Sequence, residues 1–179
     1  MQRPSLPPDP HVITAAVNID RPVAEVFDFY RDLRNLPRFL GDVLDVRKLE
    51  PTTYRWTIAG PLASRTHWVV RITSERPDLL LSYETVGASA WKTRWEVHFN
   101  SGPDPRQTVV REIMTMPLGT LGRLGLALIG KFPAAEMQSN LRRLKQLLET
   151  GKVTDFSHAV PGKFLRTLNG ARSRRRFRP

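Results

Sequence analysis

The chain has 179 residues, of which 40% are hydrophobic, and a formal net charge of +11. These values are typical of one globular domain with a sizeable core, and the absence of cysteine excludes disulfides, thiol nucleophiles and zinc–thiolate sites. Eight of the 28 basic residues and one of the 17 acidic residues lie in 151–179, so this segment carries +7 and the remainder +4.

The N-terminal part of the chain predicts one strand after a flexible segment. Residues 1–10 contain four prolines and no apolar run, which argues against a signal peptide and predicts a flexible N-terminal segment. The following run, HVITAAVNI at 11–19, has the β-branched composition of a strand. Together with the lack of a long apolar segment, these features lead us to expect a cytoplasmic protein.

Two short helices are predicted next. In DRPVAEVFDFY, Pro22 fits a first helical turn after a cap at Asp20 or Arg21. Apolar residues then recur with the spacing of one helical face, at Val23, Val26, Phe27 and Tyr30. Asp32 can cap a second helix that continues through Leu33, Leu36 and Phe39 and ends at Gly41.

From residue 42 to residue 116 the hydrophobic pattern has period two. It predicts six strands separated by turn sequences rich in Gly, Pro and Asp: Val43–Leu49, Tyr54–Gly60, Arg65–Thr73, Leu79–Val86, Trp91–Asn100 and Thr108–Thr115. The short spacing and the lack of helices between these runs indicate an antiparallel meander. Its apolar face needs a cover, and the long C-terminal helix is the only predicted element large enough to provide it.

The C-terminal third predicts that long helix and then a tail. The helical stripe consists of Met137, Leu141, Leu144, Leu147 and Leu148, with a stop at Gly151. Leu118–Phe132 has two interpretations: it is the first half of the same helix, with a bend near Gly130 and Pro133, or a lid or membrane-contacting edge through which a ligand enters. Residues 153–179 are expected to form a flexible basic tail, with five arginines between Arg172 and Arg178.

Four segments carry a family resemblance: RPVAEVFDFYRDLRNLPRFL, YRWTIAGP, SERPDLLLSYET and LRRLKQLLETG. In this order they resemble the polyketide cyclase/dehydrase and coenzyme Q-binding branch of the StAR-related lipid-transfer (SRPBCC) superfamily, over residues 11–152. The resemblance implies the α+β helix-grip fold, in which a curved seven-stranded antiparallel sheet wraps around a long C-terminal helix. It also implies a cavity for an apolar ligand, whereas activity stays open because the superfamily includes enzymes, lipid carriers and ribosome-interacting proteins.

Strand alternation predicts which side chains face the long helix. In 65–73, Trp68 and Val70 share the apolar face, and His67 and Arg71 share the other. The same parity places Leu79 and all four tryptophans inside. The candidate ligand-binding residues are Trp56, Ile58, Trp68, Val70, Leu81, Thr85, Trp91, Thr93, Trp95, Val97, Phe99, Val110 and Met114. Alternation does not distinguish side chains that line a cavity from side chains that fill a core.

The last predicted strand, TVVREIMTM, places a charge on its inner face in either register. If Val110 and Met114 point inward, so does Glu112, whereas the other parity turns Arg111 inward. The family pattern favours Glu112, which is either a proton-transfer group with a raised pKa or an ion-paired residue at the rim. Tyr54 and Tyr83 complete the candidate catalytic set with Glu112.

Other chemistries lack a motif in this sequence. His11, His67, His98 and His158 do not have metal-ligand spacing, and His67 and His98 fall on the predicted outer face. Neither a nucleophile elbow nor a phosphate-binding loop is present. We therefore expect neither a metal nor a cofactor.

Three functions follow from these features. The first is a carrier or chaperone for a hydrophobic small molecule such as a lipid, an isoprenoid quinone or a polyketide-like compound. The second is a cyclase, aromatase or dehydratase that uses the same cavity. The third is association of the basic tail with RNA, the ribosome or an anionic membrane surface.

Overall fold

The computed structural model describes residues 11–60, 63–87, 92–116 and 133–164. Seven antiparallel strands form one sheet in the order β1-β7-β6-β5-β4-β3-β2, so the first strand pairs with the last. The strands are β1 (His11–Ile19), β2 (Val43–Lys48), β3 (Thr53–Ala59), β4 (Arg65–Arg76), β5 (Leu80–Val86), β6 (Arg94–Ser101) and β7 (Thr108–Met116). The helices are α1 (Val23–Arg31), the 3-10 helix η1 (Leu33–Arg38) and α3 (Pro133–Thr150). This arrangement confirms the predicted α+β helix-grip fold.

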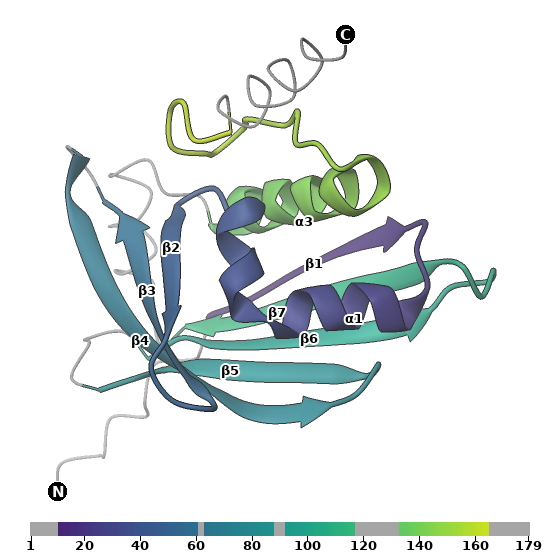
Figure 1. The fold of residues 1–179 in the computed structure, drawn as a ribbon, viewed down its shortest axis with the longest axis horizontal. Coiled ribbons are helices and arrows are strands. Elements are labelled where there is room, and N and C mark those ends of the chain that lie inside the picture. The colour runs from purple at the N-terminus through teal and green to yellow at the C-terminus, as the bar shows by residue number, and fades with distance from the viewer. Residues whose placement is uncertain (1–10, 61–62, 88–91, 117–132, 165–179) are drawn as a thin grey trace, which may run out of the picture.

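The sheet curves around helices that come from both ends of the chain (Figure 1). The long helix α3 packs mainly against β1, α1 packs against β6, and η1 packs against β2. The expectation that the long helix alone covers the sheet is therefore incomplete, because the curvature of the sheet leaves room for the two short helices. None of the helices in the described part of the chain is long and apolar enough to span a bilayer.

The short helices follow their sequence pattern except at one cap. Val26, Phe27 and Tyr30 are buried on one face of α1. Pro22 occupies the N-cap position, and no side chain caps this helix, which corrects the cap expected at Asp20 or Arg21. The Asp20 carboxylate instead accepts a hydrogen bond from the Gln107 side chain at 2.9 Å. The predicted cap of η1 is confirmed, because the backbone N–H of Arg34 donates to Asp32 at 3.1 Å.

One residue departs from the predicted strand parity. Leu79 is 56% exposed, although the alternation placed it inside. It belongs to the turn before β5, where its N–H donates to the carbonyl of Arg76 at 3.1 Å, and a turn residue does not follow the alternation of the strand. Leu118–Phe132, for which a lid or a half-helix was expected, lies outside the described residues.

The structure also corrects the start of the tail. Helix α3 ends before Gly151, whose φ of +71° is the left-handed conformation that favours glycine, as predicted. The following segment, residues 151–164, runs back over α3 and is called here the C-terminal segment (Figure 1). It contributes Val153 and Phe164 to the core, with exposed fractions of 2% and 4%. The prediction of a flexible tail is therefore wrong for residues 153–164, and residues 165–179 lie outside the described residues.

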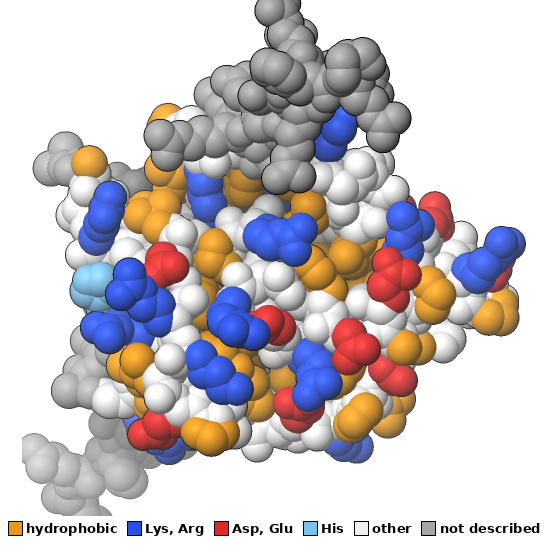
Figure 2. All heavy atoms as spheres, viewed as in Figure 1, with side chains coloured by type: hydrophobic (Ala, Val, Ile, Leu, Met, Phe, Trp, Pro, Cys, Tyr) orange, Lys and Arg blue, Asp and Glu red, His pale blue; other side chains and the backbone are white. Residues whose placement is uncertain are grey.

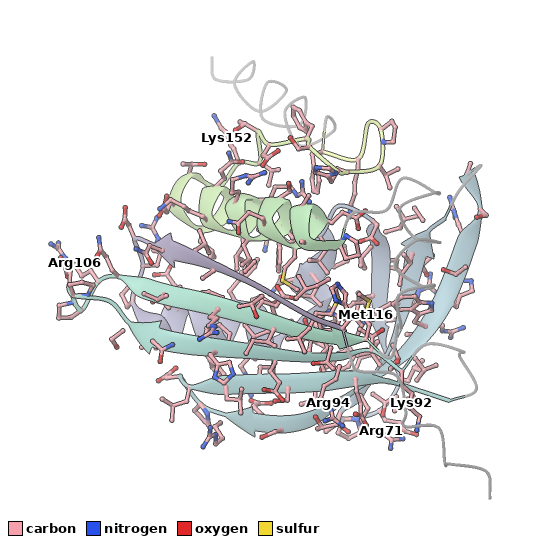
Figure 3. The ribbon with its side chains drawn as sticks, turned by 180° about the vertical axis from the view of Figure 1, so that it is seen from behind. Arg71, Lys92, Arg94, Arg106, Met116 and Lys152 are labelled. Atoms are coloured by element: carbon pink, nitrogen blue, oxygen red, sulfur yellow. The ribbon has the colours of Figure 1, made fainter. Side chains whose placement is uncertain are left out.

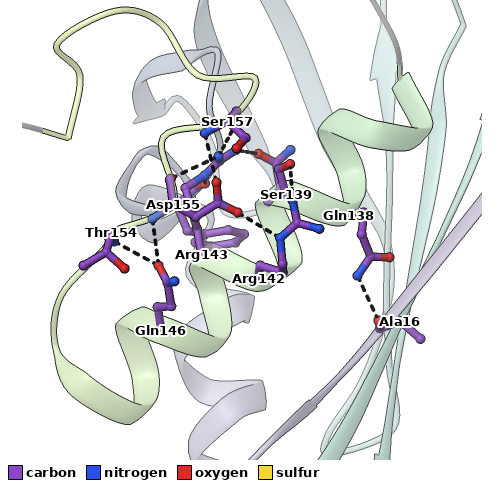
Figure 4. A network of polar contacts seen from close by, with 11 residues as sticks. Ala16, Gln138, Ser139, Arg142, Arg143, Gln146, Thr154, Asp155 and Ser157 are labelled. Carbon is purple, nitrogen blue, oxygen red and sulfur yellow. Dashed lines mark hydrogen bonds and ion pairs between the residues drawn. The ribbon is translucent and has the colours of Figure 1, made fainter.

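Arg143 on α3 holds this segment in place (Figure 4). The side chain is fully buried, and it donates from Nε to the carbonyl of Phe39 and from Nη1 to the carbonyl of Ser157, each at 2.7 Å. It thereby joins the end of η1, helix α3 and the C-terminal segment. A Cβ atom at Gly41 would lie 2.5 Å from the carbonyl oxygen of His158, so the close approach requires glycine there.

Candidate functional site

Aromatic side chains from three strands gather on the inner face of the sheet. Tyr83 on β5 and Trp95 on β6 are register partners, and their rings stack at 5.3 Å between centroids. Trp56 on β3 lies 5.9 Å from Tyr83 and 5.8 Å from Trp95 by the same measure. All three side chains are buried, as alternation predicted. These buried rings therefore form one contiguous aromatic cluster with polar atoms at its ring edges, called here the aromatic surface of the sheet.

Glu112 lies beside this surface on β7, between Ala15 of β1 and Val97 of β6. Its exposed fraction is 5%, so the predicted inward register is confirmed. The Oε2 atom is buried and has no hydrogen-bond partner among the described residues. Burial raises the pKa of Glu112 to about 7, and the hydroxyl of Tyr30 opposes this rise. At neutral pH the carboxyl is poised between its neutral and ionised forms.

Two tyrosines interact electrostatically with this carboxyl. The hydroxyls of Tyr30 on α1 and Tyr83 on β5 are 3.4 Å apart. Burial, followed by the charge of Glu112, raises the pKa of both tyrosines well above the ordinary value. Both phenols therefore remain protonated and are available as hydrogen-bond donors at neutral pH.

The structure adds a tyrosine that the predicted catalytic set does not include. The hydroxyl of Tyr30 affects the pKa of Glu112, whereas Tyr54 is buried on β3, where its ring lies 5.8 Å from Nζ of Lys48. In the sequence, Tyr30 belongs to an apolar helix stripe. The signal that could have identified it is chemical, since a buried tyrosine hydroxyl needs a polar partner.

A second polar atom in this region lacks a partner. Nε1 of Trp56 is buried and has no hydrogen-bond acceptor among the described residues. Thr85, predicted as another polar contact for a ligand, is already engaged because its hydroxyl accepts a hydrogen bond from the N–H of Thr93 at 2.9 Å. Among the residues that the structure describes, the buried side-chain polar atoms without a partner are thus a donor, Nε1 of Trp56, and an acceptor, Oε2 of Glu112.

The remaining candidate ligand-binding residues lie where alternation placed them, with one outside the described residues. The buried members are Ile58, Val70, Leu81, Thr85, Thr93, Val97, Phe99 and Val110. Trp68 and Met114 are half-buried and pack against the same core. Trp91 lies outside the described residues.

Metal binding finds no support in this arrangement. Within the ranges that the structure describes, no three His, Cys, Asp or Glu side chains are grouped to hold a metal ion. His67 is exposed and His98 half-buried on the outer face, as the alternation predicted.

Solved structures with the same fold come from several bacteria. A protein from Deinococcus radiodurans is 24% identical and has a TM-score of 0.62, with 79% of this chain and 99% of that chain covered. A protein from Thermus thermophilus is 19% identical with a TM-score of 0.61, and the match covers 76% of this chain and 95% of that chain. A START superfamily protein from Mycobacterium smegmatis is 9% identical with a TM-score of 0.59, and the match covers 77% of this chain and 99% of that chain. At these identities the likeness concerns the fold.

Sequence comparison identifies the family. No curated protein matches the chain. The model of the family described as polyketide cyclase/dehydrase and lipid transport matches residues 10–149, which include every described strand and all but the last residue of α3. The chain belongs to the polyketide cyclase/dehydrase and lipid transport family, as its sequence motifs, its curved sheet and its long C-terminal helix all indicate.

Proposed function

We propose that this protein is a carrier or chaperone that binds an oxygen-bearing hydrophobic molecule at the inner face of the sheet. The ligand classes that fit are a lipid, an isoprenoid quinone or a polyketide-like compound. Support comes from the aromatic surface of Trp56, Tyr83 and Trp95, which offers an apolar contact area with polar ring edges. The family match supports the same class of ligand.

The observation that carries this proposal is the pair of buried polar atoms without partners. Leaving a buried donor or acceptor unsatisfied costs about 1 to 3 kcal/mol, and such groups are rare in folded proteins. A ligand carbonyl or ether oxygen would accept from Nε1 of Trp56, and a ligand hydroxyl would donate to Oε2 of Glu112. An apolar molecule with oxygen substituents meets both requirements, whereas a pure hydrocarbon meets neither.

Mass spectrometry of an organic extract tests this proposal. We expect the purified protein to release an apolar, oxygen-containing compound in near-stoichiometric amount. Trp56→Phe keeps the ring contact and removes the N–H, so it should weaken binding of that compound about fivefold, equivalent to about 1 kcal/mol.

The control variant is Phe156→Leu, because Phe156 is an exposed aromatic residue of the C-terminal segment and does not belong to the inner face of the sheet. This substitution should leave affinity nearly unchanged. Repeated extracts without any apolar compound, or equal effects of the two variants, would contradict binding through Trp56.

A second candidate function is a cyclase, aromatase or dehydratase acting in the same place. The specific observation in its favour is a carboxyl with a pKa of about 7 beside two protonated phenols. Such a carboxyl can abstract a proton from a carbon next to a ligand carbonyl, while a Tyr30 or Tyr83 hydroxyl donates to the oxygen that becomes negatively charged. The proton can then return from Glu112 to a leaving hydroxyl, which departs as water.

Glu112→Gln distinguishes the two functions. The amide cannot exchange a proton, so an enzyme should lose at least about a hundredfold in turnover of the extracted compound or a polyketide-like analogue. A carrier should show no turnover in either form and nearly unchanged affinity. Wild-type turnover that survives the substitution would exclude Glu112 as the acid–base group.

A role in RNA, ribosome or membrane association remains a prediction from the sequence. It rests on the arginines between Arg172 and Arg178, which lie outside the described residues. Removal of residues 165–179 should abolish such association if the tail carries it, and a binding assay at two salt concentrations would measure this.

A further inference from the structure

A groove of about 510 Å³ lies on the outer face of the sheet, away from the aromatic surface. It crosses β2, β3 and β4 and is lined by Leu44, Asp45, Arg47, Arg55, Thr57, Arg65 and His67. In Figure 2, basic side chains gather around a histidine at the left of the molecule, over these strands, with few acidic side chains among them. The groove is therefore separate from the proposed apolar ligand site and has a different chemistry.

The groove holds more positive charge than its carboxylate neutralises. Arg47 and Arg55 are directly opposite each other on β2 and β3, an arrangement of like charges that is unfavourable in a sheet. Asp45 pairs with Arg47 at 2.9 Å. Within the described ranges, Arg55 and Arg65 have no acidic partner, whereas Asp45 is the one carboxylate in the lining.

Several other exposed arginines of this protein do have a carboxylate partner. Arg31, Arg34, Arg94 and Arg106 each lie within 3.5 Å of a carboxylate oxygen. Next to the groove, Arg71, Glu84 and Arg94 lie side by side on β4, β5 and β6. Two arginines therefore flank one carboxylate there. Figure 3 shows Arg71 and Arg94 near each other on the back of the sheet. The positive charge of the groove thus continues into the neighbouring row of the sheet.

The donors in the groove are placed for an oxyanion. Arg55 and Arg65 lie on either side of the Thr57–His67 pair, whose hydroxyl and ring Nδ1 are 3.3 Å apart. Each arginine lies two residues from this pair along its own strand, a distance of about 7 Å, so two long side chains that extend toward the pair can contact one phosphate or pyrophosphate between them. Planar guanidinium groups bind phosphate oxygens in a bidentate manner. Thr57 also lines the groove.

We propose that this groove binds a phosphate group, with Arg55 and Arg65 as its principal contacts. The phosphate can belong to a soluble phosphorylated molecule or to the headgroup of a phospholipid, because the recognition chemistry is shared. Two observations support this assignment: Arg55 and Arg65 have no acidic partner among the described residues, and Arg47 lies directly opposite Arg55 in the lining of the same groove. It does not depend on the proposed function, since the groove and the aromatic surface are on opposite faces of the sheet.

Titration of the full chain with inorganic pyrophosphate tests the soluble source, and sedimentation with phosphatidylglycerol vesicles tests the headgroup. The double variant Arg55→Gln/Arg65→Gln should weaken whichever interaction is present at least about tenfold, at about 0.15 M salt. The matched control is Arg34→Gln/Arg106→Gln, which removes the same charge from exposed positions elsewhere. The control should change affinity less than about twofold.

The outcomes separate a built site from general attraction of a basic protein to anions. Pyrophosphate binding that only the groove variant weakens supports a soluble phosphate ligand. Vesicle binding alone, with the same selectivity between variants, supports a headgroup. Equal effects of the two double variants on both probes, or no binding of either probe by the wild type, overturn the proposal.

Discussion

Replacing Arg143 with alanine should lower the free energy of unfolding by about 3 kcal/mol. The side chain is fully buried and donates to the carbonyls of Phe39 and Ser157, which come from the two segments on either side of α3. Its guanidinium also lies over the ring of Phe164, 5.3 Å from the centroid. Truncation leaves both carbonyls without their donor and opens a cavity beneath the C-terminal segment. Urea unfolding followed by tryptophan fluorescence measures the change.

Arg142→Ala is the matched control for this prediction. Arg142 is the next residue on α3, but its side chain is half-exposed, pairing with Asp155 at 2.9 Å. An exposed ion pair contributes about 0 to 1 kcal/mol, so this variant should unfold nearly like the wild type. Arg143→Lys should resemble Arg143→Ala, because a single ammonium group cannot reproduce the fork that reaches both carbonyls. Equal stabilities of the Arg143 and Arg142 variants would contradict the role of Arg143.

Glu112→Gln should remove a pH dependence of stability that the wild type shows between about pH 5 and pH 7.5. The pKa of Glu112 is raised from 4.5 to about 7 in the folded protein by burial. A folded-state pKa above the unfolded value means that the folded state binds the proton more tightly. The stabilising contribution is complete below the unfolded pKa and is lost as the pH rises through the folded one. Over this interval the wild type should lose about 2 kcal/mol more than the variant.

The pH window avoids the other strongly shifted groups. Burial lowers the pKa of Lys163 to about 8, so its contribution changes above that pH, and it raises the pKa of Tyr30 and Tyr83 further above the window. Glu84→Gln on the outer face of β5 provides the control, because Glu84 pairs with Arg94, whose charge is constant over this window. The stability of this variant should follow the wild-type pH dependence. Urea unfolding at both ends of the window gives the comparison. Parallel curves for wild type and Glu112→Gln would mean that the carboxyl ionises in the folded state as it does in water.

These two predictions concern different parts of the fold, and their results can be interpreted separately. Arg143 fixes the C-terminal segment on the outer side of α3, whereas Glu112 lies on the sheet among the aromatic side chains. A ligand that donates to Glu112 would also shift its pKa. Repeating the pH comparison with the extracted compound bound would therefore connect stability with the proposed function.

The sequence by itself determined the strands and the side chains that point inward. Period-two alternation is a local property, because successive side chains of a strand point to opposite faces whatever lies on those faces. Alternation thus placed Trp56 and Trp95 inside, whereas on the last strand it left two parities open and the family pattern favoured the one that turns Glu112 inward. It failed at Leu79 because this residue belongs to a turn.

Tertiary structure alone decided which of these side chains meet. Tyr30 and Glu112 are far apart in sequence, and they interact because α1 packs inside the curve of a sheet in which β7 lies between β1 and β6. Arg143 stands beside the apolar stripe of α3, and its burial depends on the C-terminal segment crossing it. The outer groove likewise depends on the register that sets Arg47 opposite Arg55. Periodicity specifies the direction in which a side chain leaves its own strand or helix. The partner of that side chain comes from a distant segment, and the packing of the whole core sets the position of that segment.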